Sequence, residues 1–218
     1  MKKIIFLLAV ITSFRATAQV EEGILKYSMN IQGEQPGTIN PMVGNSSVTI
    51  YFKKGKSLTE MSTPIYSMQT LYDSKGLLLL MNAVGKQFYT RKSPEDIQKE
   101  KLAKNEVAPL IVLSKEKKKI LGYDCSKATI TLSDKSGKKV TLTVWCTDKI
   151  HNIPDVGPVT ADIQVKIKGI PLEIQMNEGP INSLMKATEV SIKPVAESVF
   201  NLSTSGYTER KPNPVQKR

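Results

Sequence analysis

The sequence predicts a mainly β, α+β fold in which antiparallel strands dominate and one or two short helices accompany them. From Glu22 onward, apolar and polar residues alternate with a period of two in most segments, the pattern of strands with one buried face. Turn-forming residues separate these segments at short intervals. A convincing helix start occurs at one place, at Ser93-Pro94.

The segment 120–147 is the clearest β-hairpin. Apolar residues alternate on both sides of the turn Asp134-Lys135-Ser136-Gly137. We expect a register that pairs apolar with apolar residues throughout, with the partners Leu132/Val140, Ile130/Leu142 and Ala128/Val144.

This register also bears on the two cysteines. It places Cys146 opposite Ser126 and turns Cys125 to the other face. A slip of one residue would bring the cysteines opposite each other, at the cost of pairing Ile130 with Thr141. The hydrophobic pattern therefore argues against a Cys125–Cys146 disulfide and an exported location argues for one, so the question stays open.

The N-terminus predicts export. Lys2 and Lys3 precede an apolar run, and Ala16-Thr17-Ala18 supplies small residues for cleavage, which together are typical of a signal peptide. We expect a signal peptide over 1–18, a single β-rich domain over 19–207 and a disordered basic tail over 208–218. The mature protein is expected to be soluble and periplasmic or secreted, because no later apolar run is long enough to span a bilayer.

The positive charge does not indicate nucleic-acid binding. Removal of residues 1–18 takes away three basic and no acidic residues, which lowers the formal charge from +11 to +8. The remaining lysines are spread over strands and turns without a recognition motif, as on solvated strand faces. The densest run, from Lys115 to Lys119, would attract an anionic headgroup or glycan only weakly.

The remaining elements follow from local patterns. The capping serine Ser93 predicts a helix from Pro94 to Lys104, lying on a surface or over an opening because its apolar content is low. Alternation predicts strands over 163–167 and 170–176, with a bulge or tight bend at Gly169 between them. A last strand is expected from Ala187 to Lys193, with Val190 and Ile192 facing inward.

No catalytic, cofactor or metal site is predicted. A hydrolase would have to combine the single histidine, His151, with Cys125 or Cys146, and no orienting group accompanies them. Zinc and copper sites need more ligands than one histidine and two cysteines provide, and no acidic loop has calcium-binding spacing.

Apolar side chains on the expected strands are the remaining candidates for binding. Methionine adapts to flexible apolar ligands such as acyl chains. The candidates for lining a ligand site are Met29, Phe52, Met68, Met81 and Met176. Ordinary core filling is the alternative for each of them.

Four motifs resemble an exported bacterial envelope family of unknown function, a relative of the GLPGLI family. The motifs are Ile120-Leu121-Gly122-Tyr123-Asp124-Cys125, Val144-Trp145-Cys146-Thr147, Gly169-Ile170-Pro171-Leu172-Glu173 and Val199-Phe200-Asn201-Leu202 with Gly206-Tyr207. The full Leu-Pro-Gly-Leu segment of GLPGLI proteins is missing, and Thr204 or Ser205 stands where the last motif usually has proline. The motif residues Gly122, Tyr123, Cys125, Trp145, Cys146, Gly169 and Pro171 are expected to be structural.

The family is similar to LolA/LolB-type lipoprotein carriers. The resemblance implies a curved antiparallel sheet, an incomplete barrel, with helices over its concave side and a groove for acyl chains. It brings no catalytic residues. The resulting hypothesis is a non-enzymatic protein that binds a lipid, lipoprotein or other apolar ligand. A structural or interaction module of an envelope protein complex is the alternative, and a hydrolase is a remote one.

Overall fold

A computed structural model describes residues 22–32, 46–104, 108–133, 138–150, 153, 155–156, 158–178 and 181–211. The strands are β1 (Glu22–Gln32), β2 (Ser46–Lys53), β3 (Lys56–Ser62), β4 (Tyr66–Asp73), β5 (Gly76–Ala83), β6 (Lys86–Lys92), β7 (Leu110–Ile120), β8 (Tyr123–Ser133), β9 (Lys139–Thr147), β10 (Asp155–Val156), β11 (Val159–Thr160), β12 (Ile170–Glu178), β13 (Ile181–Ser191) and β14 (Thr208–Glu209). The helices are α2 (Pro94–Lys104), α3 (Ala161–Ile167) and the 3-10 turn η1 (Glu197–Phe200).

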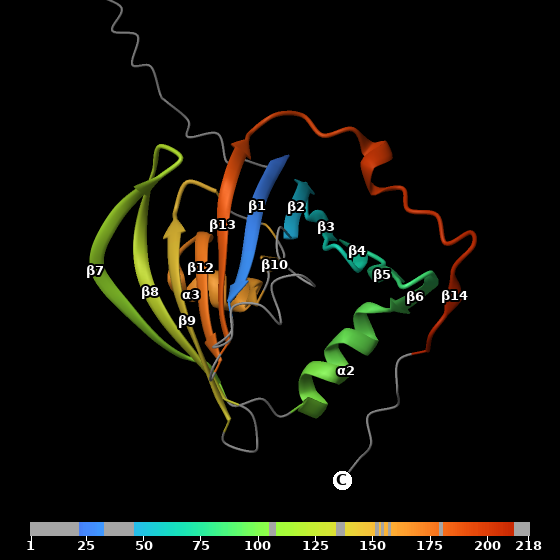
Figure 1. Ribbon diagram of the computed structural model, residues 1–218, viewed down its shortest axis with the longest axis horizontal. Helices are drawn as coiled ribbons and strands as arrows, with labels where there is room; N and C mark the ends of the chain where they lie inside the picture. Colours follow the sequence, from blue (N-terminus) through green and yellow to red (C-terminus); the bar gives the residue numbers. More distant parts are fainter. Residues whose placement is uncertain are drawn as a thin grey trace, which may run out of the picture.

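Twelve of the described strands form one open sheet in the order β14-β6-β5-β4-β3-β2-β1-β13-β12-β9-β8-β7. All neighbours are antiparallel except β14, which runs parallel to β6. Figure 1 shows the strands side by side along an arc, with α2 on its inner side and the chain after β13 passing along the outer side of β2–β6. The predicted fold class, a curved antiparallel sheet with two short helices, is confirmed.

Two-residue turns set the register of the first half of the sheet. Lys54-Gly55 joins β2 to β3, Ser74-Lys75 joins β4 to β5 and Val84-Gly85 joins β5 to β6. A two-residue connection leaves a hairpin a single register, so each side chain has a fixed cross-strand partner. In the second half, β8 and β9 pair in the predicted register, Ala128 opposite Val144 and Ile130 opposite Leu142. The predicted turn over 134–137 lies outside the described residues.

Helix α2 forms where the sequence predicts it. The Asp96 amide donates a hydrogen bond to the Ser93 hydroxyl oxygen at 3.1 Å, and the Ser93 hydroxyl donates to the Asp96 carboxylate at 3.0 Å. The Lys92 ammonium at the end of β6 lies 2.7 Å from the Glu100 carboxylate of α2. This ion pair holds α2 against the sheet.

The predicted strand over 163–167 is wrong. These residues form α3, in which Ile163 and Ile167 are buried and Val165 between them is 78% exposed. Residues four apart share one face of a helix, so the same apolar positions satisfy a helix as well as a strand. The predicted bend at Gly169 is where α3 passes into β12, and the bulge of β12 lies between Pro171 and Glu173.

The end of the chain also differs from expectation. The last long strand, β13, begins at Ile181 and ends at Ser191, so Ile192 lies beyond it and is 44% exposed instead of facing inward. Thr208 and Glu209, expected in a disordered tail, form β14. The expected signal peptide and residues 212–218 of the tail lie outside the described residues.

The sheet has two apolar clusters, one on each face. The larger cluster lies on the face that carries Leu25 and Ile50, which we term the inner face, and α3 contributes Ile163 and Ile167 to it. The smaller cluster lies on the outer face of β3–β5, under the segment that contains Val195 and Phe200. No helix within the described part of the chain is long and apolar enough to cross a membrane.

Candidate functional site

A row of thioether and aromatic side chains crosses the inner face of β3–β6. The registers place Met61 opposite Met68, Met68 opposite Met81 and Met81 opposite Phe88. We term these four residues the methionine row. It continues on β2 at Val48, which is buried and faces Met61.

The methionine row is only partly buried. All four of its side chains keep some exposure to solvent, in contrast to the fully buried Leu25 and Ile50 on the same face. The Tyr66 hydroxyl donates a hydrogen bond to the Met61 sulfur at 3.4 Å. At the other end, the Arg210 guanidinium lies 3.9 Å from the centre of the Phe88 ring. The row is thus an accessible apolar strip between a buried end and a cationic end.

The outer face of the same strands is closed by the chain itself. Leu58, Leu71, Leu78 and Leu80 are buried against Val195 and Phe200. The segment is fastened by its backbone, because the Lys53 ammonium donates to the Val195 carbonyl at 2.6 Å and the Val195 amide donates to the Glu22 carboxylate at 3.0 Å.

Two carboxylates reinforce this fastening. The Glu197 carboxylate accepts a hydrogen bond from the Lys56 ammonium at 2.8 Å, and this bond lowers the pKa of Glu197. The pKa of Glu22 is lowered chiefly by the hydrogen bond from the Val195 amide. Both groups stabilise the closed arrangement when ionised.

The structure brings together two of the five predicted lining residues. Met68 and Met81 are direct cross-strand neighbours. Met29 lies on the same face but pairs with Met185 of β13. Met176 lies on β12, where it packs against the larger cluster away from the row. Phe52 is 1% exposed within the core. Phe88 was missed, although the two-residue turn Val84-Gly85 that aligns it with Met81 is visible in the sequence. Met61, a strand methionine outside the five candidates, joins the row through the three-residue connection between β3 and β4.

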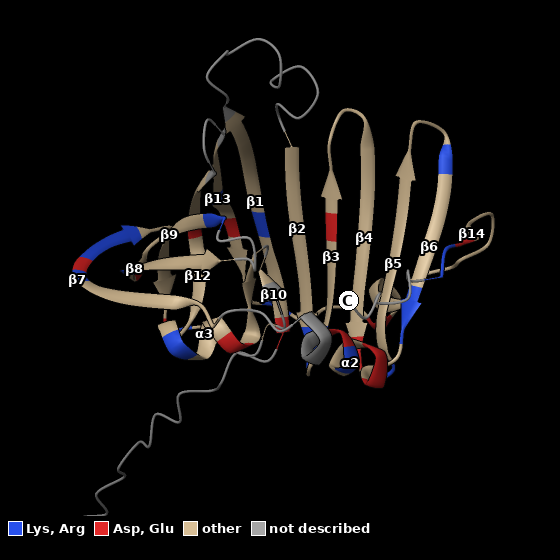
Figure 2. Cartoon of the chain, turned by 90° about the horizontal axis from the view of Figure 1, so that it is seen from below, with Lys and Arg blue, Asp and Glu red and all other residues tan. Residues whose placement is uncertain are grey.

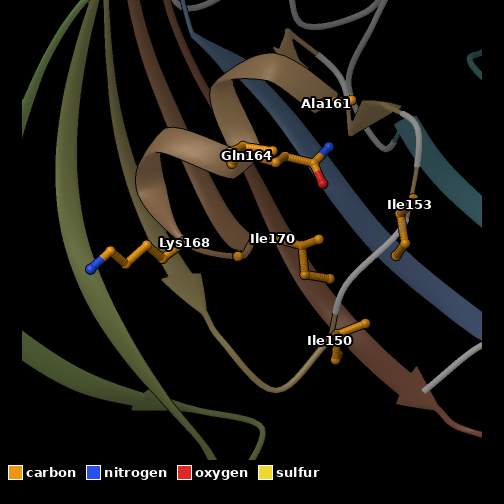
Figure 3. Close-up of a pocket in the computed structure, with 8 residues that line it drawn as sticks. Ile150, Ile153, Ala161, Gln164, Lys168 and Ile170 are labelled. Atoms are coloured by element: carbon orange, nitrogen blue, oxygen red, sulfur yellow. The ribbon is translucent and has the colours of Figure 1, made fainter. Parts of the chain in front are cut away.

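A second candidate is a pocket of about 240 Å³ beside α3, which we term the α3 pocket. Ile150, Ile153 and Ile170 contribute apolar side chains, and Figure 3 shows Lys168 directed away from them. The Gln164 amide nitrogen donates to the Val159 carbonyl at 3.1 Å, so this polar group is already satisfied. The volume lies below the roughly 300–1,000 Å³ of typical ligand sites.

Several motif residues of the hairpin and of β12 occupy turns or make contacts within the fold. Gly122 has a positive φ of 84° in the two-residue turn between β7 and β8. Gly169, also at positive φ, lies against the Thr147 carbonyl, where a Cβ atom would collide. The Tyr27 hydroxyl donates a buried hydrogen bond of 2.9 Å to the carbonyl of Pro171, and the half-buried Tyr123 packs against the larger cluster.

The two cysteines are free thiols in the structure, and both are buried. Cys146 lies opposite Ser126, as the register predicts. Burial raises the pKa of both thiols, which makes them poor nucleophiles. Trp145 lies under the Lys118 ammonium, 4.3 Å from its ring centre, and Lys118 also pairs with Glu173 at 2.6 Å.

No group of three or more His, Cys, Asp or Glu residues that could hold a metal ion occurs in the described part of the chain. His151, the base of the remote hydrolase hypothesis, lies outside the described residues. Basic residues occur at both ends of β6, whereas α2 begins with acidic residues (Figure 2).

A family model described as "Domain of unknown function (DUF4412)" matches residues 35–162, more than half of the chain. No curated protein matches the chain.

Several solved structures show a partial likeness to the chain. PNGF-II is 17% identical with a TM-score of 0.48, and the match covers 87% of this chain but 32% of PNGF-II, so the chain spans about a third of that protein. Lipoprotein LppX of Mycobacterium tuberculosis is 10% identical, with a TM-score of 0.32 and coverage of 79% and 88%. A LolA superfamily protein of Nitrosomonas europaea is 11% identical, with a TM-score of 0.34 and coverage of 84% and 90%. At these scores the likenesses carry no argument about ligand or activity.

Proposed function

The chain belongs to the DUF4412 family, and we propose that this member is an exported, non-enzymatic protein that binds an apolar ligand, a lipid or the acyl chain of a lipoprotein. The ligand lies on the inner face of the sheet along the methionine row. The observation that carries this proposal is the partial exposure of four large apolar side chains aligned across four neighbouring strands.

The chemistry of the row supports a flexible ligand. Methionine side chains are unbranched and polarizable, and they adjust to irregular apolar shapes more readily than leucine or isoleucine. When an acyl chain covers an apolar strip that was in contact with water, the buried apolar area favours binding by roughly 25 cal/mol per Å². A catalytic role has no support among the described residues, since both thiols are buried with raised pKa values.

The proposal is tested with purified mature protein. Lipid extracts of the protein are analysed by mass spectrometry, and a fluorescent fatty acid is titrated and then displaced with unlabelled lipid. Met68→Glu places a charge in the middle of the row and should weaken binding at least tenfold, because the carboxylate must be desolvated under the ligand. Absence of both co-purifying lipid and fluorescent binding would reject the proposal.

Two variants locate the binding site. Val84→Glu adds the same charge at a turn residue that is 87% exposed and does not belong to the row, so it should bind like the wild type. Val165→Glu adds it at the α3 pocket. A loss of binding in Val165→Glu but not in Met68→Glu would move the site to the α3 pocket and contradict the assignment to the methionine row.

A second candidate function is docking of a partner protein at β7. This strand ends the sheet in the described part of the chain, and its first half exposes Leu110, Val112 and Leu113. Lysines and a register shift beyond Leu113 limit strand addition to this half. Cross-linking of cells with and without Val112→Lys would test it, and loss of a specific cross-linked partner in the variant is the expected result.

A further inference from the structure

The inner face of β1–β6 has an unbalanced charge. By register, the inner positions of these strands in the described residues include no aspartate or glutamate, whereas the acidic Glu22, Glu60 and Asp73 face outward. The inner positions of β6 carry Lys86 and Lys92. Lys92 is neutralised by Glu100 of α2. A ligand on this face therefore meets cations and no strand-borne carboxylate.

Arg210 adds a cation at the end of the methionine row. Thr208 pairs with Phe88 in the parallel β14–β6 ladder, so Arg210, two residues later, returns to the face of Phe88. The Arg210 amide donates to the Tyr89 carbonyl at 2.7 Å, and the Thr90 hydroxyl donates to the Arg210 carbonyl at 3.1 Å. These bonds fix the backbone from which the guanidinium reaches the Phe88 ring.

The guanidinium has no carboxylate partner in the described part of the chain, and its residue is exposed. Stacking on an aromatic ring uses the flat face of a guanidinium and leaves its N–H donors at the rim available. Those donors form a planar fork that matches a carboxylate with two parallel hydrogen bonds. Arg210 is thus preorganised to accept an anionic group at the end of an apolar strip.

The strip has a direction. It runs from the buried Val48 through Met61, Met68 and Met81 to Phe88, four strand spacings of about 4.8 Å each. One end is closed by the core and the other ends at a cation. A molecule with one apolar chain and one anionic head fits this strip in a single orientation, with the head at Arg210.

We infer that the ligand of the methionine row is a single-chain carboxylate amphiphile, a fatty acid, whose carboxylate is bound by Arg210 and whose chain extends toward Val48. This inference rests on the proposed function and specifies the chemical class of the ligand. Arg210 acts as a specificity-determining residue, because it distinguishes an acid from an uncharged molecule of equal chain length.

The test compares dodecanoic acid, 1-dodecanol and dodecyl phosphate as competitors of a bound fluorescent fatty acid on the full mature chain. The acid should bind roughly 10- to 100-fold more tightly than the alcohol, the value of a hydrogen bond to a charged group. Affinity should rise up to roughly fourfold for each methylene added to the acid. Equal affinity for acid and alcohol, or preference for the phosphate over the acid, would overturn the inference.

Variants at the edge strand complete the test. Arg210→Gln should reduce the affinity for the acid at least tenfold and leave that for the alcohol unchanged, and Arg210→Lys should restore part of it. Arg91→Gln removes an exposed arginine from the outer face of the neighbouring strand β6 and should change neither affinity. If Arg210→Gln weakens acid and alcohol equally, the inference is wrong. If neither compound binds to the wild type, the proposed function itself fails.

Discussion

The two faces of β3–β6 belong to the same strands but differ in burial. On the outer face, leucines are buried permanently beneath Val195 and Phe200 of the same chain. On the inner face, methionines and Phe88 lie in a row that stays partly open to water. The difference indicates that branched side chains such as leucine suit permanent packing against a segment of the same chain. Unbranched thioether side chains suit reversible contact with a ligand.

The outer face should dominate stability, and neighbouring residues of β5 test this. Leu80 is 3% exposed on the outer face and Met81 is half-buried on the inner face. Leu80→Ala should lower the free energy of unfolding by about 2–4 kcal/mol, because it leaves a cavity under the C-terminal segment. Met81→Ala should cost about 1 kcal/mol or less, since its site is already open to solvent. Urea denaturation measures both, and equal losses would remove the distinction between the faces.

Chemical oxidation should separate the methionines of the inner face by their depth. With dilute hydrogen peroxide, Met61, Met68 and Met81 should form sulfoxides several-fold faster than Met185, which is 7% exposed. Peptide mass spectrometry over a time course gives the individual rates. A bound fatty acid should slow the oxidation of the row and leave the rate at Met185 unchanged. Uniform rates at all four positions would mean that the row is not accessible.

Acid should loosen the outer face selectively. The pKa values of Glu22 and Glu197 are lowered in the folded state, so each stabilises the fold above its unfolded pKa, about 4.3. This contribution is lost as the pH falls from that value through the lower folded pKa. The protection factor of the Val195 amide, the ratio of its intrinsic exchange rate to its observed rate at the same pH, should therefore fall below about pH 4, while the protection factors within β8 should not. A pH-independent rate ratio between the two sites would contradict this.

Much of the scaffold was predictable because neighbouring residues determine it. The β8–β9 register follows from matching Ile130 with Leu142, and helix α2 follows from Ser93 and Pro94. The segment 163–167 could not be assigned, because apolar residues at three alternate positions satisfy a strand and its outer two satisfy a helix. The burial of Ile163 and Ile167 in the larger cluster decides the matter, and the distant strands of that cluster are not encoded locally.

The site was predicted in part for a related reason. Met68 and Met81 were identified by type, but Met61 and Phe88 join them only through successive hairpin registers. Arg210 could not be foreseen, since a polar tail near the C-terminus gives no sign of pairing with β6. Residues that meet only through tertiary contacts are the ones that single-sequence reasoning misses.

The place of β1 in the sheet constrains the order in which the protein can assemble. β1 pairs with β2 on one side and with β13 on the other, and the Thr188 hydroxyl reaches the Lys26 carbonyl across 162 residues of sequence. The hairpins β2–β6 and β7–β9 are local, whereas the centre of the sheet cannot close until nearly the entire chain is available. A chain that crosses a membrane starting from its N-terminus would therefore stay incompletely folded until β13 has emerged. An incompletely folded chain is the state that translocation requires.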